Sequence, residues 1–156
     1  MDITEIGDRL EIGQLLVRYV DAIDTKDWDL LDTVFTPDAR LDYTSSGGPD
    51  AAGDYPTMKA WLQTQLAMFP MTQHLLGQSA ITFEGDGDDR IARCRTLFHN
   101  PMGAPVNDAG TFDLEGTAIG VFTVGGWYHD TCVHTPDGWR IAEKVEDQAF
   151  MRDFPM

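Results

Sequence analysis

The sequence has few cationic residues. Its 156 residues include 11 Lys and Arg against 26 Asp and Glu, which gives a formal net charge of −15 at pH 7. Such a charge repels phosphate backbones and acidic lipid surfaces. The composition therefore predicts a protein that binds neither nucleic acid nor membrane.

The sequence also lacks a long apolar run. No stretch approaches the roughly 18 to 20 apolar residues that cross a bilayer, and no basic-then-apolar segment opens the chain. We therefore expect a cytoplasmic protein.

Cysteine is scarce, with only Cys94 and Cys132. The two lie far apart in the sequence, lack C-x-x-C spacing, and sit in apolar, strand-like stretches. This placement predicts buried free thiols rather than a disulfide.

Several functional motifs are missing from the chain. It has no Gly-x-Gly-x-x-Gly or Gly-Lys-Ser/Thr element for nucleotides and no Gly-x-Ser-x-Gly element for a hydrolase. His99, His129 and His134 lack the His-x-His or His-Glu-x-x-His spacing that favours zinc. We therefore expect no metal and no organic cofactor.

The residues that are present favour one domain built from helices followed by strands. Hydrophobic residues make up 42% of the chain, which suffices for one core, so residues 1–156 are expected to form a single domain. Helical spacing predicts helices over 5–23, over 28–35 with a Thr25 cap and a stop at Pro37, and over 58–69. The apolar stripe of the first helix comprises Ile12, Leu15, Leu16, Tyr19 and Ile23.

The rest of the chain reads as strands. Alternation over 39–43 predicts a strand that faces Tyr43 inward. Further strands are expected over 72–84, 90–99, 112–124, 127–135 and 138–147. Helices followed by strands indicate an α+β fold with helices on one face of a curved antiparallel sheet. Residues 100–111 are expected to form a long loop, either a lid or partner contact or an inert hairpin connection.

Asp24 is the first candidate for chemistry. It closes the stripe of the first helix, where the negative end of the helix dipole and partial burial favour a protonated carboxyl, as suits a general base. The alternative is that Asp24 helps to cap the second helix.

His74 and Tyr43 are the other candidates. His74 begins a strand, where an imidazole could face a cavity and accept a proton while a carboxylate orients it; an ordinary packed or exposed histidine is the alternative. Tyr43 would point a hydroxyl at a ligand or water, or be a core tyrosine.

Four stretches together resemble the SnoaL-like, nuclear-transport-factor-2-like superfamily, nearest to its scytalone dehydratase branch. They are Asp-Thr-Lys-Asp-Trp-Asp at 24–29, Leu-Asp-Tyr at 41–43, Thr-Gln-His at 72–74 and Asp-Gly-Trp at 137–139. The resemblance implies a conical α+β barrel, with a strongly curved, mixed, mainly antiparallel sheet and about three N-terminal helices on its concave side. An apolar small-molecule pocket lies inside such a fold.

The resemblance also assigns residues. Asp24 and His74 match the Asp–His pair of scytalone dehydratase and hexachlorocyclohexane dehydrochlorinase, and Tyr43 matches a dehydratase tyrosine that polarises substrate through water. The substrate-binding residues it implies are Tyr19, Ile23, Met58, Trp61, His99, Trp127 and His129. Alternation along the penultimate strand sets Tyr128 and Asp130 on the face opposite Trp127 and His129, unless a bulge near Gly125-Gly126 reverses the assignment.

These observations predict a cofactor-independent lyase or isomerase for a small cyclic, aromatic, steroid- or polyketide-like compound. His74, held by Asp24, would remove a carbon-bound proton while Tyr43 steadies negative charge; Asp24 as the direct base is equally open. The alternatives are a non-catalytic binding or dimerisation module, or the small subunit of a ring-hydroxylating dioxygenase. Apolar residues from Val121 to Val133 on the open sheet face predict a homodimer, with a trimer as the alternative.

Overall fold

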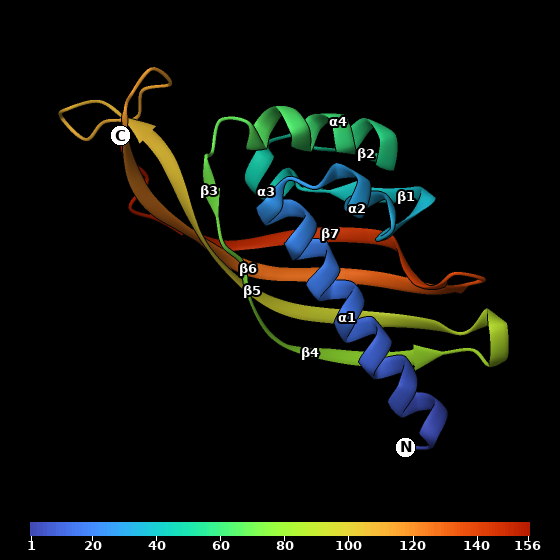
Figure 1. The fold of residues 1–156 in the computed structure, drawn as a ribbon. Coiled ribbons are helices and arrows are strands. Elements are labelled where there is room, and N and C mark those ends of the chain that lie inside the picture. The colour runs from blue at the N-terminus through green and yellow to red at the C-terminus, as the bar shows by residue number, and fades with distance from the viewer.

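A computed structural model describes residues 1–156, apart from the side chain of Asp88. Helices dominate the first half of the chain and long strands the second (Figure 1). The helices are α1 (Ile3–Thr25), α2 (Trp28–Asp32), α3 (Thr44–Gly47) and α4 (Tyr55–Leu66), with a 3₁₀ turn η1 (Gly87–Asp89). The strands are β1 (Phe35–Asp42), β2 (Ala52–Asp54), β3 (Met71–Thr72), β4 (Leu75–Glu84), β5 (Ile91–Val106), β6 (Ala118–Thr135) and β7 (Gly138–Arg152).

The strands form one curved, seven-stranded sheet. Their order is β2-β1-β7-β6-β5-β3, and β4 also pairs with β5. β1 and β7 run parallel, whereas the other pairs are antiparallel. The predicted α+β class and the mixed, mainly antiparallel sheet are therefore confirmed. The sheet does not close on itself, so the implied conical barrel is corrected to an open sheet.

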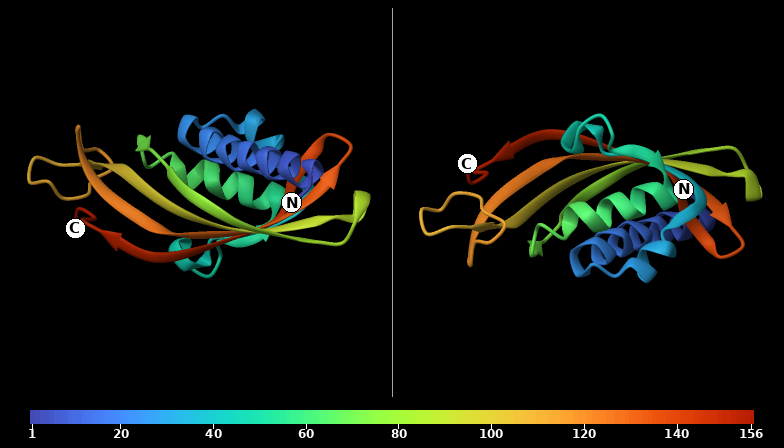
Figure 2. Two further views of the ribbon diagram at one scale, coloured as in Figure 1. Left: turned by 90° about the horizontal axis from the view of Figure 1, so that it is seen from below. Right: turned by 90° about the horizontal axis from the view of Figure 1, so that it is seen from above.

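Helices α1 and α4 lie on the concave side of this sheet (Figure 2). The buried stripe of α1 is the predicted one, since Ile12, Leu15, Leu16, Tyr19 and Ile23 are all at most 3% exposed. Each such large apolar side chain contributes about 1.5–3 kcal/mol when it leaves water. Burial of this stripe fixes α1 diagonally across the strands, with its C-terminal end near β3 (Figure 1).

Aspartates begin the two longest helices. The Asp2 carboxylate accepts a hydrogen bond from the Glu5 backbone N–H at 2.8 Å, and Asp54 accepts one from Thr57 N–H at 2.9 Å. Helix α1 ends where Lys26 adopts a left-handed conformation, with φ of 55°. These caps satisfy backbone groups that the helix itself leaves free.

The second helix is shorter than predicted. Asp27, not Thr25, caps it by accepting from Leu30 N–H at 2.9 Å. The helix ends before Phe35, which pairs with Ile141 as the first residue of β1. An aromatic residue fits a half-buried strand well, so the expected helix over 28–35 was extended too far.

The predicted loop at 100–111 is largely strand. The strand expected over 90–99 continues to the end of β5, and the connection to β6 occupies 107–117 instead. Pro101 and Pro105 lie on this outer part of β5, beyond β4, where the two-residue strand β3 pairs with β5 only at Met102 and Gly103. A lid or partner role for the shorter connection stays a prediction.

The strands expected over 112–124 and 127–135 are a single strand, β6. Gly125 and Gly126 lie inside it, at a bulge whose extra residue, Ala149, belongs to β7. A Cβ on Gly126 would lie 2.1 Å from a β7 carbonyl oxygen, so only glycine permits this approach. The predicted bulge exists, but it shifts the alternation of β7 and not that of β6.

Two whole-chain predictions can be compared with the structure. Cys94 and Cys132 are buried free thiols, as predicted. In the part of the chain that the structure describes, no helix combines the length and the apolar character needed to cross a membrane. The cytoplasmic location stays a prediction.

Candidate functional site

Asp24 and His74 are in direct contact. Asp24 is the next-to-last residue of α1, and His74 lies between β3 and β4. The His74 ring Nδ1 is 2.6 Å from Asp24 Oδ1, and the His74 backbone N–H donates to Oδ2 at 2.7 Å. The hydroxyl of Thr72 donates to Oδ1 at 2.9 Å. Three donors therefore converge on one carboxylate, and Asp24 does not cap α2.

These contacts keep Asp24 ionised. Burial raises the pKa of Asp24, but the hydrogen bonds and charge of His74 and the Thr72 hydroxyl outweigh burial, so the pKa lies below its ordinary value. The expected protonated Asp24 is therefore corrected. An ionised carboxylate accepts the Nδ1–H of His74, which leaves the lone pair of the neutral ring on Nε2.

The Nε2 atom of His74 faces Tyr128. The Tyr128 hydroxyl lies 3.0 Å from Nε2, so it donates to the free lone pair. The His74 side chain is only 4% exposed, and its ring lies beside the stacked rings of Phe98 and Tyr128, whose centroids are 4.3 Å apart. The imidazole is thus held on both nitrogens.

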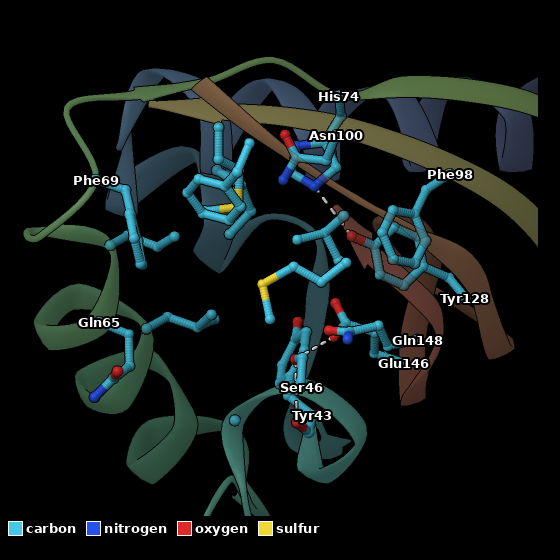
Figure 3. A pocket seen from close by; sticks show the side chains of 18 of the residues that line it. Tyr43, Ser46, Gln65, Phe69, His74, Phe98, Asn100, Tyr128, Glu146 and Gln148 are labelled. Atoms are coloured by element: carbon cyan, nitrogen blue, oxygen red, sulfur yellow. Dashed lines mark hydrogen bonds between the residues drawn. The ribbon is translucent and has the colours of Figure 1, made fainter. Parts of the chain in front are cut away.

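His74 and Tyr128 border a cavity of about 290 Å³ between the helices and the sheet (Figure 3). This volume is near the lower end of the roughly 300 to 1,000 Å³ that small-molecule pockets occupy. The wall is mainly apolar and is formed by Ile23, Trp61, Leu62, Leu66, Phe69, Phe98, Met102, Phe122, Val124, Met151 and Phe154. The polar lining residues are Tyr19, Tyr43, Ser46, Gln65, His74, Asn100, Tyr128, Glu146 and Gln148.

Tyr19 and Tyr43 form a second polar contact in the cavity. Their hydroxyls are 2.9 Å apart, and both side chains are at most 3% exposed. Burial raises the pKa of each phenol well above its ordinary value. Both groups are therefore neutral hydroxyls, one of which donates to the other and leaves a donor for a bound molecule.

Glu146 is a second carboxyl group on the cavity wall. The Ser46 hydroxyl donates to its Oε1, and both side chains appear at the same end of the cavity in Figure 3. Ser45 ties α3 to β7 beneath them, because its hydroxyl donates to the Glu146 carbonyl at 2.8 Å and accepts from Gln148 N–H at 2.9 Å. Burial raises the pKa of Glu146 above its ordinary value.

A buried ion pair lies behind the tyrosines. Lys144 Nζ is 2.9 Å from Asp130 Oδ1, and both side chains are fully buried. The ammonium lies 4.0 Å from the ring centroid of Tyr19 and 3.9 Å from that of Tyr128. Attraction between a cation and aromatic faces holds both rings in place.

The structure brings most of the predicted residues together. His74 and Tyr43 line the cavity, and Asp24 contacts His74 from behind. The predicted substrate-binding residues Tyr19, Ile23 and Trp61 line it as well. Met58 does not, because it is fully buried in the core under α4.

Three predicted lining residues project from the other face of the sheet. His129 is half-exposed and lies 3.7 Å from Asp147. His99 is exposed near Phe150, and Trp127 is covered by the guanidinium of Arg95. The expectation that His99, Trp127 and His129 line the cavity is therefore corrected, because all three lie outside it. The inward residues are their neighbours in sequence.

Asn100, Tyr128 and Glu146 are among the polar cavity residues that the sequence analysis missed. Regular alternation along β5 and β6 places Asn100 and Tyr128 inward together with Phe98 and Phe122. This alternation was the signal that could have found them. Glu146 was hidden because β7 contains two register shifts, so its charged stretch reads as a solvent-exposed face.

A family model described as a SnoaL-like domain matches residues 4–145. An uncharacterised protein of Mycobacterium tuberculosis is 43% identical over 152 residues, which covers 97% of this chain and 92% of that protein.

Solved structures share the fold. A protein from Kribbella flavida superimposes with a TM-score of 0.79 at 26% identity, covering 96% of this chain and 95% of that one. A scytalone dehydratase candidate from Novosphingobium aromaticivorans gives 0.80 at 16% identity, with 100% and 93% covered. The hexachlorocyclohexane dehydrochlorinase LinA, type 2, gives 0.72 at 13% identity, with 97% and 91% covered.

Proposed function

The chain belongs to the SnoaL-like domain family, and on that premise we propose that it is a lyase or isomerase that needs no cofactor. Its substrate is a small cyclic, aromatic, steroid- or polyketide-like compound. The cavity is lined mainly by apolar side chains and carries polar groups at particular points, which is the usual make-up of a small-molecule site.

One observation carries the proposal: His74 borders an apolar cavity with its Nε2 beside the Tyr128 hydroxyl, while the Asp24 carboxylate holds Nδ1. A neutral imidazole has a proton affinity suited to removing a carbon-bound proton near neutral pH. Asp24 stabilises the imidazolium that forms and fixes the ring orientation. Asp24 itself does not line the cavity, so His74 is the base in this mechanism.

Neutral donors beside the base receive the negative charge. The Asn100 Oδ1 accepts from Gln73 N–H at 3.2 Å, which turns the Asn100 amide N–H₂ away from the backbone and toward the cavity (Figure 3). Tyr43 and Tyr19 supply a further hydroxyl donor. Donors placed before the reaction stabilise an enolate oxygen as it forms.

The comparisons support elimination chemistry in particular. Two proteins that share the fold are described as a scytalone dehydratase candidate and a hexachlorocyclohexane dehydrochlorinase. Dehydration and dehydrochlorination both begin with a hydrogen on carbon and end with a double bond. The Asp24–His74 contact supplies the base that such reactions share.

Exchange of α-protons tests the proposal without knowledge of the natural substrate. Cyclohexanone and β-tetralone are incubated with the protein in heavy water, and deuterium at the α-carbon is followed by proton NMR. The wild-type protein should accelerate exchange of at least one ketone above the buffer rate. Binding that raises the unfolding temperature without any exchange would instead identify a ligand-binding module.

We also propose a homodimer built on the outer sheet face. Leu97, Val121 and Phe150 are 48%, 55% and 41% exposed there, and a second copy would cover this apolar area. Light scattering should give twice the mass of one chain, and Leu97→Glu should lower it. A monomeric wild-type protein would rule the dimer out, and a threefold mass would identify the trimer.

A further inference from the structure

Glu146 is a titratable group that the proton abstraction described above does not use. The register shift between Thr131 and Cys132 inserts an extra residue into β7 and turns Lys144, Glu146 and Gln148 toward the helices. Lys144 continues into the core, whereas Glu146 stops at the cavity wall. In the described part of the chain, Ser46 is the only side chain that donates to its carboxyl group.

The surroundings of Glu146 favour a proton on its carboxyl group. Burial raises its pKa, and the Ser46 hydrogen bond and the charges of Lys144 and His74 lower it without cancelling the rise. The titratable groups that interact electrostatically with it are His74 between β3 and β4, Tyr19 on α1, Tyr43 after β1, Tyr128 on β6 and Lys144 on β7. Of these, only Lys144 and a protonated His74 would stabilise a carboxylate.

Glu146 and His74 open onto the same cavity from different parts of its wall. In Figure 3 the Nε2 of His74 and the Ser46–Glu146 contact both point into the space lined by Tyr128. A molecule that fills about 290 Å³ therefore contacts both groups. A base and an acid on one substrate allow a proton to leave one carbon while a neighbouring group departs.

We infer that Glu146 is the proton donor to the leaving hydroxyl group in the dehydration of an uncharged substrate. The inference rests on the proposed function of His74 as the base. His74 Nε2 takes the α-proton, and the C–H electron pair becomes the new carbon–carbon double bond. The C–O bond to the β-hydroxyl breaks, and the Glu146 proton joins that oxygen to release water.

The atoms and charges balance within the site. After the step His74 carries one extra proton and Glu146 lacks one, so transfer of a proton from the imidazolium to the carboxylate restores both groups. The products are an enone and water, and no oxidant or metal takes part.

The cavity wall indicates that the substrate is uncharged. Among the described lining residues there is no Lys or Arg, so an anionic substrate would have no cationic partner. A ketone oxygen has neutral donors instead, in Asn100 and the tyrosine pair. A β-hydroxyl can meet Glu146 and Ser46.

Three probe reactions separate the acid from the base. Cyclohexanone in heavy water reports proton removal alone. β-Hydroxycyclohexanone reports dehydration through the absorbance of its enone. β-Acetoxycyclohexanone yields the same enone, but acetate leaves without being protonated. The variants are Glu146→Gln and, as a matched control on the outer face of β7, Glu143→Gln, since Glu143 is exposed.

Glu146→Gln should slow dehydration by about 10²–10⁴-fold, the usual contribution of a positioned acid. It should leave deuterium exchange and acetate elimination nearly unchanged, and Glu143→Gln should change none of the three. Equal loss of all three reactions in Glu146→Gln would show a structural role and overturn the inference, as would unchanged dehydration. Exchange without dehydration in the wild type would overturn the inference and retain the base; no exchange in the wild type would overturn both.

Discussion

The two carboxyl groups that serve the cavity differ in almost every contact. Asp24 receives hydrogen bonds from the Thr72 hydroxyl and from the ring and backbone of His74. Glu146 receives one, from Ser46. The pKa of Asp24 is lowered and that of Glu146 is raised. Similar functional groups on one cavity are thus driven toward opposite protonation states.

This difference would allow one site to hold the proposed base and the proposed acid at the same pH. An ionised Asp24 keeps the proton of the neutral His74 ring on Nδ1, and the burial of Glu146 favours a proton on its carboxyl group. Burial acts on both carboxyls, so the number and charge of the donors decide the outcome. Substitutions at the Asp24–His74 contact, at Glu146 or at the buried Lys144 should each change this difference, and the largest effect on rate is expected at His74.

Loss of the base should have the largest effect. His74→Ala removes the one imidazole among the described residues that line the cavity, so deuterium exchange into the active ketone should fall by about 10³–10⁴-fold. NMR of the ketone measures the rate. His134→Ala is the control, because His134 is exposed at the far end of β6; equal losses in both variants would refute the assignment.

Loss of the buried Lys144 cation should destabilise the fold. Lys144→Met leaves Asp130 buried without its partner, which should lower the free energy of unfolding by about 3–5 kcal/mol. Urea denaturation measures this change. Arg93→Met, at the exposed pair with Glu84, should cost less than about 1 kcal/mol.

A double variant sharpens this prediction. Asp130→Leu with Lys144→Met replaces the buried pair by apolar groups and should recover much of the lost stability. If the double variant is no more stable than Lys144→Met alone, the cost comes from lost packing against Tyr19 and Tyr128 and not from the unpaired carboxylate.

Neutralising the carboxylate that orients the base should have a smaller effect on rate. Asp24→Asn keeps the shape but no longer fixes the Nδ1–H form of His74, so deuterium exchange should fall by about 10²-fold. Asp21→Asn, on the exposed face of α1, serves as the matched control. Unchanged exchange in Asp24→Asn would show that the contact with His74 is only structural.

The smallest effect concerns the pH dependence of stability. The contributions of Asp24 and Glu146 to the free energy of unfolding should change in opposite directions with pH. The lowered pKa of Asp24 means that its contribution is present above its ordinary value of 3.8 and is lost as the pH falls through the lower folded value. The raised pKa of Glu146 means that its ionisation costs stability as the pH rises above 4.5.

Denaturation series between acid and neutral pH measure both responses. The stability advantage of wild type over Asp24→Asn should shrink toward acid pH, and Glu146→Gln should gain on wild type toward neutral pH. Parallel curves for wild type and both variants would contradict the opposite shifts.

The sequence was sufficient to predict the helix-to-sheet organisation and the contact between Asp24 and His74. Apolar spacing in α1 is strictly periodic, so Tyr19 and Ile23 could be placed inward. The Thr-Gln-His stretch at 72–74 identified His74 as a site candidate. The direction of the Asp24 shift was wrong because it depends on Thr72 and on the His74 backbone, 48 and 50 residues further along the chain.

The sheet residues could not be placed from the sequence because strand register depends on partners. One inserted residue in β7 exchanges the inward and outward faces. Lys144 and Glu146 therefore looked like solvent-facing charges, although one is buried and the other borders the cavity. His99 and His129 looked functional by residue type, yet the alternation of β5 and β6 carries them outward.

The protonation of His74 tests the account most directly. Long-range proton–nitrogen correlation NMR on protein labelled at the imidazole nitrogens distinguishes the two neutral forms of the ring. The account predicts a proton on Nδ1, facing Asp24, and none on Nε2 when the ring is neutral. A proton found on Nε2 instead would leave no lone pair facing the cavity and would contradict the assignment of His74 as the base.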